Sequence, residues 1–202
     1  MKIKLHQDDL PSKLDLGLSI AVDTETMGLN PLRDKLCLVQ ISSGNNVCHL
    51  IKINNLKKKP INIINILKNK NILKIFHYAR FDMAMLRHNL NIKIPNVYCT
   101  KIVSKLVRTY TDKHGYKDLC KELLNKSISK IEQSSDWGGE LSISQQKYAA
   151  TDVLYLHKIK KKLDAMLERE GRKDLANACF EFLEHRTNLD LNGWIDQDIF
   201  RH

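Results

Sequence analysis

The sequence predicts an α/β protein with a mixed central sheet flanked by helices. Three apolar segments follow one another closely, at 18–22, 36–42 and 47–51. Turn-forming stretches at 30–31 and 43–45 separate them, so we expect these strands to form an antiparallel meander. Later in the chain, short apolar segments alternate with helical ones, which is typical of parallel βα units packed on the same sheet.

The individual elements follow from hydrophobic pattern and length. Leu18–Val22 is apolar on both faces, as in a central strand. We expect helices at 61–68 and 79–89 and short strands at 72–76 and 97–100, followed by mostly helical sequence.

The C-terminal part contains the longest predicted helix. Ser142 and Gln145 form a capping-box pattern at its start. The helix should run to about Glu170, because Gly171 is placed to end it. Another helix, at about 173–184, leads into the tail.

Length and composition favour one domain over residues 1–202. A chain of 202 residues that is 43% hydrophobic can bury a sizeable core. The net charge of +10 favours an acidic partner such as nucleic acid. However, 21 of the 25 residues from 51 to 75 are Ile, Lys or Asn, a bias that A/T-rich codon usage would also produce. The charge is therefore only supporting evidence.

Cysteine usage and the N-terminus predict a cytoplasmic protein. No C-x-x-C pair occurs, so we expect buried thiols rather than a disulfide framework at Cys37, Cys48, Cys99, Cys120 and Cys179. Residues 1–10 include two aspartates and lack the apolar core of a signal peptide. No window is long and apolar enough to predict a membrane span. We expect no membrane association, and the sequence indicates no obligate protein partner.

Three segments carry residues suited to metal chemistry. Asp23 and Glu25 have the i, i+2 spacing that points two side chains to one side of a strand. Carboxylates so placed suit a hard cation such as Mg²⁺ or Mn²⁺, although two exposed acids in a turn would look the same. Asp82 falls in the first turn of a predicted helix, where an acid can also be purely structural. Tyr148 and Asp152 are i and i+4 on one helix face, a spacing that amphipathic patterning alone can produce.

Together the segments predict more than each does alone. Four carboxylates from separate elements could converge on a pair of divalent ions, as two-metal phosphodiester sites require. One ion would activate water, and the other would stabilise the leaving 3′ oxygen. The hydroxyl of Tyr148 could orient that water.

The three segments resemble the motifs of the DEDDy group of 3′→5′ exonucleases, and within it the ribonuclease D family. The first motif spans 21–42, the second spans 77–82, and the third spans 148–156 and is preceded by 133–137. Their order and spacing agree over about 19–165, which leaves a helical tail at 172–202. The resemblance implies a ribonuclease H-like exonuclease fold in a short, single-domain bacterial form.

The resemblance also implies roles for the acids. Asp23, Glu25 and Asp152 would hold the first ion, and Asp23 would bridge to the second. Asp82 would support the second site through water. Tyr148 is the residue that distinguishes this group from its histidine-bearing counterpart.

Five further residues are candidate substrate contacts. The backbone near Thr26 and the side chains of Met27 and Leu29 would lie against the terminal nucleotide, although ordinary loop packing would also explain the two side chains. His77 is a substrate contact or a loop or core histidine. Trp137 could stack on a base, or it could anchor the core beside the site.

The expected activity is removal of single nucleotides from RNA 3′ ends, giving nucleoside 5′-monophosphates. RNA is preferred to DNA only because of the family, since no motif recognises a 2′-hydroxyl. An exodeoxyribonuclease is therefore the main alternative. A non-catalytic nucleic-acid-binding module is another, but it should have lost one of the four acids or Tyr148, and all are present.

Overall fold

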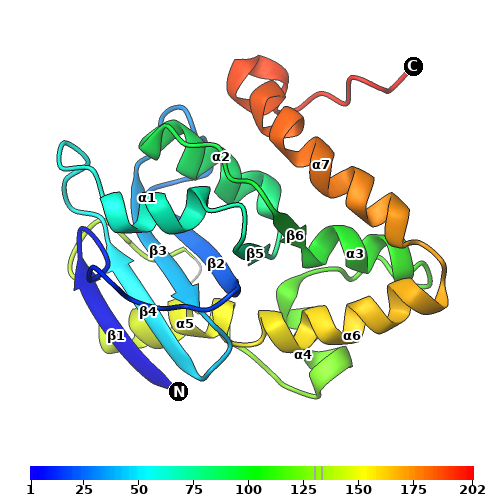
Figure 1. Cartoon of the computed structure of the whole chain (residues 1–202), viewed down its shortest axis with the longest axis horizontal. Helices are drawn as coiled ribbons and strands as arrows, with labels where there is room; N and C mark the ends of the chain where they lie inside the picture. Colours follow the sequence, from blue (N-terminus) through cyan, green and yellow to red (C-terminus); the bar gives the residue numbers. More distant parts are fainter. Residues whose placement is uncertain (130, 133) are drawn as a thin grey trace.

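The computed structural model describes residues 1–129, 131–132 and 134–202. These residues form one mixed six-stranded sheet with helices on both faces (Figure 1). Lys130 and Gln133 lie outside the described residues, and Gln133 is the first residue of the 133–137 segment that precedes the third motif.

The sheet has the strand order β1-β4-β3-β2-β5-β6. The strands are β1 (Lys2–Gln7), β2 (Ser19–Thr26), β3 (Leu36–Ser42), β4 (Val47–Lys52), β5 (Leu73–Phe76) and β6 (Val97–Cys99). β2, β3 and β4 pair in antiparallel fashion, whereas β5 and β6 continue the sheet in parallel from β2. The predicted meander followed by parallel units is therefore confirmed.

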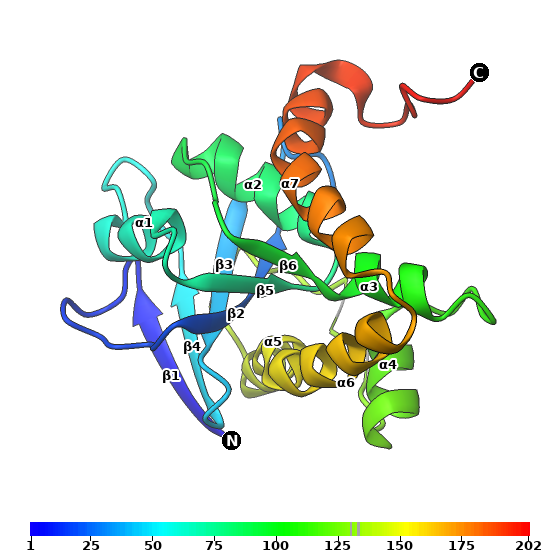
Figure 2. The same cartoon turned by 45° about the vertical axis from the view of Figure 1, so that its right-hand side comes forward.

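Helices cover the sheet in two layers. They are α1 (Ile61–Lys68), α2 (Ala79–Leu90), α3 (Thr100–Val107), α4 (Tyr116–Leu124), α5 (Ile143–Leu154), α6 (Leu156–Arg169) and α7 (Lys173–Leu189), followed by the π-helical η1 (Asp190–Trp194). Figure 2 shows α1 and α2 on one side of the sheet and α5 and α6 on the other. Each layer buries its own apolar cluster against the strands, which fixes the sheet rigidly between them.

The strand that carries the first acids is longer than the sequence indicates. We expected it to end at Val22, but β2 continues to Thr26, so Asp23 and Glu25 lie inside the strand. The reason is its partner: Asp23 pairs with Gln40 and Glu25 with Leu38 before the register shifts at Thr26.

The edge strand β1 was not predicted from the sequence. Its alternation of Lys, Ile, Lys and Leu belongs to an edge strand, and it pairs in parallel with β4 over its full length. Most of its residues stay exposed, so it lacks the apolar run by which the central strands were recognised.

The predicted long helix to Glu170 is wrong, because the helix breaks at Tyr155 into α5 and α6. The hydroxyl of Tyr116 donates to the carbonyl of Thr151 at 2.7 Å and accepts from the amide of Tyr155 at 3.2 Å. These two backbone groups would bond each other in a continuous helix. Insertion of a side chain into this ladder is a recognised cause of a kink.

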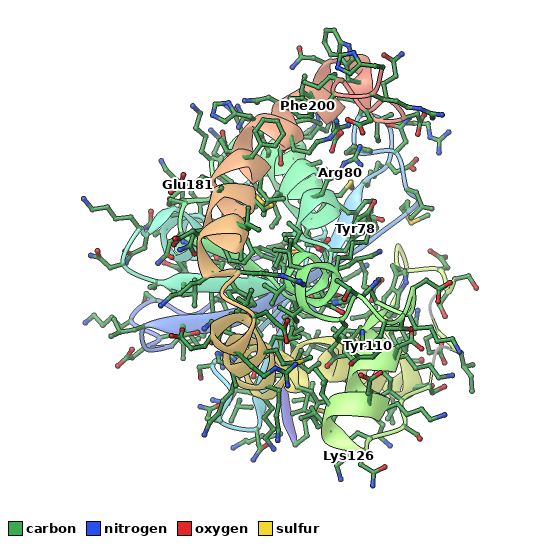
Figure 3. All side chains as sticks on the ribbon, turned by 90° about the vertical axis from the view of Figure 1, so that its right-hand side faces the viewer. Tyr78, Arg80, Tyr110, Lys126, Glu181 and Phe200 are labelled. Atoms are coloured by element: carbon green, nitrogen blue, oxygen red, sulfur yellow. The ribbon has the colours of Figure 1, made fainter. Side chains whose placement is uncertain are left out.

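The C-terminal part of the chain is tied back to α2. Asp190 accepts hydrogen bonds from Arg80 at 2.6 and 2.7 Å and from Arg186 at 2.7 Å. Arg80 lies in the first turn of α2, near the C-terminal half of α7 (Figure 3). This buried carboxylate therefore joins α2 to the end of α7.

Two further expectations concern thiols and membranes. Four of the cysteines are buried as expected, but Cys179 on α7 is exposed. Within the described residues, no helix combines the length and apolarity needed to span a bilayer.

Candidate metal centre

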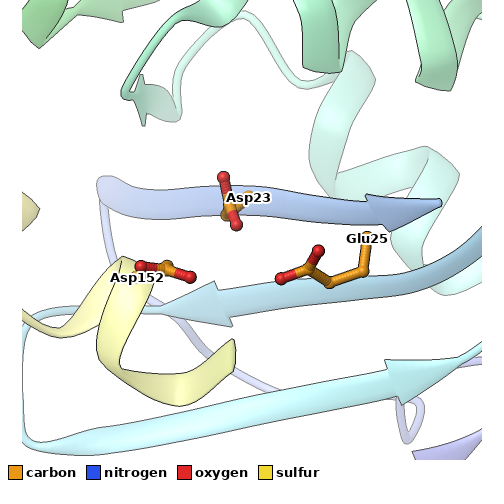
Figure 4. A group of neighbouring side chains, drawn as sticks. All are labelled: Asp23, Glu25 and Asp152. Atoms are coloured by element: carbon orange, nitrogen blue, oxygen red, sulfur yellow. The ribbon is translucent and has the colours of Figure 1, made fainter. Parts of the chain in front are cut away.

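The strand and the kinked helix bring three carboxylates together. Asp23 and Glu25 project from β2 toward α5, and Asp152 projects from the last turn of α5 (Figure 4). One carboxylate oxygen from each lies within 4.8 Å of the others, and each residue is partly exposed. Three residues predicted from separate motifs therefore meet at one site.

Asp82 reaches the centre from the other layer. It is 3% exposed, and its Oδ1 accepts a hydrogen bond from the Thr24 hydroxyl at 2.6 Å. Thr24 points to the α2 side of the sheet, opposite to its neighbours Asp23 and Glu25. Asp82 is consequently outside the group of three, but its charge still contributes to raising the pKa of Glu25.

The acids oppose one another's ionisation. Burial raises the pKa of Asp23 to about 7, although a hydrogen bond from the Thr24 backbone partly offsets this rise. The pKa of Glu25 rises to about 10 through burial first and then through Asp23, Asp152 and Asp82. Burial and Asp23 also raise the pKa of Asp82. A cation between these groups would favour their charged forms.

Tyr148 lies beside the acids. It lies one turn before Asp152 on the same face of α5, and its pKa is raised by burial and by Asp152, Glu25 and Asp23. The hydroxyl therefore stays protonated at neutral pH and can donate a hydrogen bond.

The donor set fits a hard divalent cation. It consists of carboxylate oxygens without histidine or cysteine, which suits Mg²⁺ or Mn²⁺ better than zinc or copper. The crowding of three partly buried acids would be relieved by a cation, which is a physical reason for one to bind there.

The loop after β2 carries two of the substrate-contact candidates. Met27 and Leu29 are 52% and 80% exposed. Two hydrogen bonds hold the loop: the Met27 amide donates to the Lys35 carbonyl at 3.0 Å, and the Thr26 hydroxyl donates to the Gly28 carbonyl. Met27 also faces Gly138, where an added Cβ would lie 2.8 Å from its sulfur. The side chains of Met27 and Leu29 are thus available to a ligand.

Trp137 is 2% exposed and belongs to the apolar cluster beneath α5. Its ring lies 6.0 Å from that of Tyr148, and its backbone carbonyl accepts a hydrogen bond from buried Lys52. Of the two alternatives for Trp137, this arrangement supports anchoring of the core, because a base could not reach the face of a buried ring.

His77 is held at the junction of β5 and α2. Its Nδ1 lies 2.9 Å from the Thr100 hydroxyl, which itself donates to the Phe76 carbonyl. The hydroxyl proton is therefore used, and His77 Nδ1 must be the donor. Its ring also packs 5.8 Å from Tyr116, so the imidazole is oriented from two sides.

Comparison with known proteins now places the chain. A family model described as a 3′-5′ exonuclease matches residues 6–168. The chain belongs to this exonuclease family. The resemblance expected from the three motifs is confirmed, and so is the assignment as an enzyme of this class.

Relatives of the exonuclease include both RNA and DNA enzymes. A ribonuclease D of Acidiphilium cryptum (strain JF-5) is 31% identical over 77% of this chain and 39% of that protein. A DNA polymerase I of Aquifex aeolicus (strain VF5) is 32% identical over 77% of this chain and 25% of the polymerase. The chain spans less than half the length of the curated ribonuclease D proteins that it matches.

Solved structures of Brucella melitensis NrnC match the exonuclease over its whole length. The structure with bound Mg²⁺ is 51% identical, with a TM-score of 0.95 and 100% of both chains covered. The structure bound to pGG is 52% identical, with a TM-score of 0.96, and covers 100% of this chain and 99% of that one. With the mixed sheet, these matches confirm the ribonuclease H-like exonuclease fold.

Three residues that contact the acids or the helix beside them were not predicted from the sequence. Gln40 on β3 donates to Asp23 and Glu25, Thr24 donates to Asp82, and Tyr116 kinks the helix beside Asp152. The one available signal was Gln40, an amide within an otherwise mostly apolar strand, because such a residue needs a buried partner.

Proposed function

We propose that this exonuclease removes single nucleotides from RNA 3′ ends and releases nucleoside 5′-monophosphates by a two-metal-ion mechanism. The observation that carries the proposal is the meeting of Asp23, Glu25 and Asp152 within 4.8 Å, with Tyr148 one turn before Asp152 on the same face of α5. Carboxylates from separate elements that meet at one point are the ligands that a metal site for in-line phosphodiester hydrolysis requires.

The acids would hold Mg²⁺ or Mn²⁺. Asp23, Glu25 and Asp152 would bind one ion, Asp23 would also contact a second, and Asp82 would support that second site from the α2 side. Bound ions would supply an activated water and neutralise charge on the phosphoryl group. The crowding that raises the pKa of Asp23 and Glu25 makes the acid cluster receptive to a cation.

Tyr148 would orient the attacking water. Its raised pKa keeps the hydroxyl protonated, and its position one turn before Asp152 on α5 places it beside the acid cluster. It would act by positioning and not by taking a proton.

The substrate would be a short strand that ends at the acids. Met27, Leu29 and the backbone of Thr26 would receive the terminal nucleotide, and His77 would contact the strand from the start of α2. Trp137 would support these contact residues from the core. Because NrnC of Brucella melitensis binds pGG, we include short 5′-phosphorylated dinucleotides among the proposed substrates.

DNA is the second candidate substrate. It is favoured by the similarity to a DNA polymerase I, and none of the candidate contact residues identifies a 2′-hydroxyl. RNA remains preferred because the curated relatives include several ribonuclease D proteins.

The test uses 5′-labelled RNA and DNA of one sequence, and 5′-labelled pGG, incubated with Mg²⁺ or Mn²⁺. We expect a ladder that shortens from the 3′ end, release of nucleoside 5′-monophosphates, and no digestion when the 3′ end is blocked. Digestion of a 3′-blocked strand would indicate an endonuclease and would contradict the proposal.

Two variants provide the control for the acid cluster. Asp23→Ala should abolish digestion, whereas Asp174→Ala, which removes an exposed acid from the first turn of α7, should digest at the parent rate. If the parent leaves both strands and pGG intact with either metal, or if Asp23→Ala digests at the parent rate, the proposal is wrong.

A further inference from the structure

Gln40 is the polar side chain that faces the acids from the neighbouring strand. It pairs in register with Asp23 and is 0% exposed. Its Nε2 lies 3.4 Å from Asp23 Oδ2 and 3.3 Å from Glu25 Oε1. A single amide group therefore contacts two of the three clustered carboxylates at once.

The charges of the acids determine the orientation of this amide. When Asp23 and Glu25 are ionised, as they must be to hold a cation, a flipped Gln40 would turn Oε1 toward two carboxylates and leave no donor between them. In the orientation that the structure has, Nε2 donates to both acids. Both hydrogen bonds become stronger when a cation holds the acids in their ionised forms.

The carbonyl oxygen of the Gln40 amide makes no comparable contact. Oε1 of Gln40 is buried and has no hydrogen-bond partner among the described residues. All the other residues of β3 are buried too, so an apolar side chain of similar length would suit the surroundings better. A residue that leaves a buried carbonyl unpaired is poorly explained by fold stability alone.

We propose that Gln40 is a positioning residue that pre-orients Asp23 and Glu25 for a divalent ion. By holding one oxygen of each carboxylate, its amide limits rotation of both side chains and sets the direction of their other oxygens. Less ordering is then needed when an ion binds. This inference rests on the proposed metal-dependent function and assigns to it a residue that is not itself a ligand.

The test is Gln40→Met, which preserves length and removes both donors and the unpaired carbonyl. Calorimetric titration with Mn²⁺ should show affinity lower by about 10–100-fold, as is usual when a group supporting metal ligands is lost. The melting temperature without metal should stay the same or rise. The Mn²⁺ concentration for half-maximal nuclease activity should increase, with kcat largely restored when Mn²⁺ is in excess.

The control is Ser42→Ala on the same strand and face. Its buried hydroxyl donates to the Val47 carbonyl and contacts no acid of the cluster, so Mn²⁺ affinity should not change. If the Gln40→Met protein does not fold, Gln40→Leu takes its place. Parent-like Mn²⁺ affinity in the substituted protein would overturn the inference, whereas failure of the parent itself to bind Mn²⁺ would overturn the proposed function.

Discussion

Asp23 shows how a single residue links burial to metal binding. Its carboxylate lies between β3 and α5, where burial raises its pKa to about 7. Proton and metal therefore compete for the same oxygen atoms near neutral pH. Metal affinity should rise as pH increases, because a ligand carboxylate must lose its proton before it binds.

The first prediction concerns Asp23→Asn without metal. The folded protein retains the Asp23 proton to a higher pH than the unfolded chain, so this stabilising contribution is complete below about pH 4 and is lost as pH rises toward 7. Asparagine does not titrate. The variant should therefore gain on the order of 1–2 kcal/mol in free energy of unfolding relative to the parent at pH 7.5, and less at pH 5.

Urea denaturation in EDTA at both pH values measures this difference. Addition of Mg²⁺ at pH 7.5 should then stabilise the parent and leave the variant almost unchanged. An equal difference between the two proteins at pH 5 and pH 7.5 would show that ionisation of Asp23 does not oppose folding.

The second prediction concerns Tyr148→Phe. Loss of the hydroxyl should lower kcat by about 10²-fold, since misplacing a reacting group by about 1 Å can cost that much. Mn²⁺ affinity should change little, because tyrosine is not among the clustered ligands. The matched control is Tyr110→Phe. It removes a hydroxyl that belongs to an exposed side chain and donates a hydrogen bond to Glu122, which is not one of the clustered acids. Equal rates for both variants would contradict the role of Tyr148.

At this scale the sequence predicts charged residues better than neutral ones. Asp23, Glu25 and Asp152 were found because the order and spacing of their motifs together resemble those of an exonuclease family, although each spacing alone has an ordinary explanation. Gln40 and Thr24 were missed, because a neutral polar residue inside a strand does not reveal its partner. The partner of Thr24 lies 58 positions away on α2 and becomes visible only once the sheet and helix are packed.

Among the elements, the kinked helix matters most to the site. α5 ends at Leu154, two residues after Asp152, because Tyr116 takes both bonding groups of the next turn. Tyr116 also packs on His77, so one side chain from α4 contacts the second and third motifs. The position of α4 therefore influences where Asp152 points.

The third prediction is that Tyr116→Phe reconnects α5 and α6. Without the hydroxyl, the Tyr155 amide can bond the Thr151 carbonyl directly, and this helix should straighten. Amide exchange at Tyr155 should become slower, and kcat should fall because Asp152 is displaced. Tyr155→Phe is the control, since it removes a hydroxyl at the same kink but leaves the backbone bonds intact. Unchanged exchange at Tyr155 would show that the hydroxyl does not cause the break.

The elements whose boundaries depend on nearby residues were predicted better than those whose boundaries depend on distant ones. The boundaries of α1, α2 and α7 were found within a few residues at their starts, because capping and periodicity are local signals. The continuation of β2 through Glu25 depends on its pairing with β3, and the break at Tyr155 depends on a side chain 39 residues away. Neither cause can be read from the segment that it affects.

At the scale of the whole molecule, the helical tail is joined to the motif-bearing core. Asp190 is 3% exposed and receives hydrogen bonds from Arg80 in the second motif and from Arg186 on α7. Both arginines also donate to backbone carbonyls of the C-terminal segment, Arg80 to Ile195 and Arg186 to Trp194. The sequence could not indicate this connection, because Arg80 and Asp190 are 110 positions apart. The single-domain organisation over residues 1–202 stays a prediction.

The fourth prediction is that Asp190→Ala loosens the C-terminal segment. Removal of the carboxylate leaves two partly buried guanidinium groups without their shared partner, which should cost about 3 kcal/mol in free energy of unfolding. Amide exchange should become faster over 190–200 and at the first turn of α2, since Arg80 lies in that turn. Asp198→Ala, an exposed acid in the same segment, should cost much less. If the two variants unfold at the same denaturant concentration, then Asp190 does not hold the tail to α2, and the apolar contacts of α7 alone must do so.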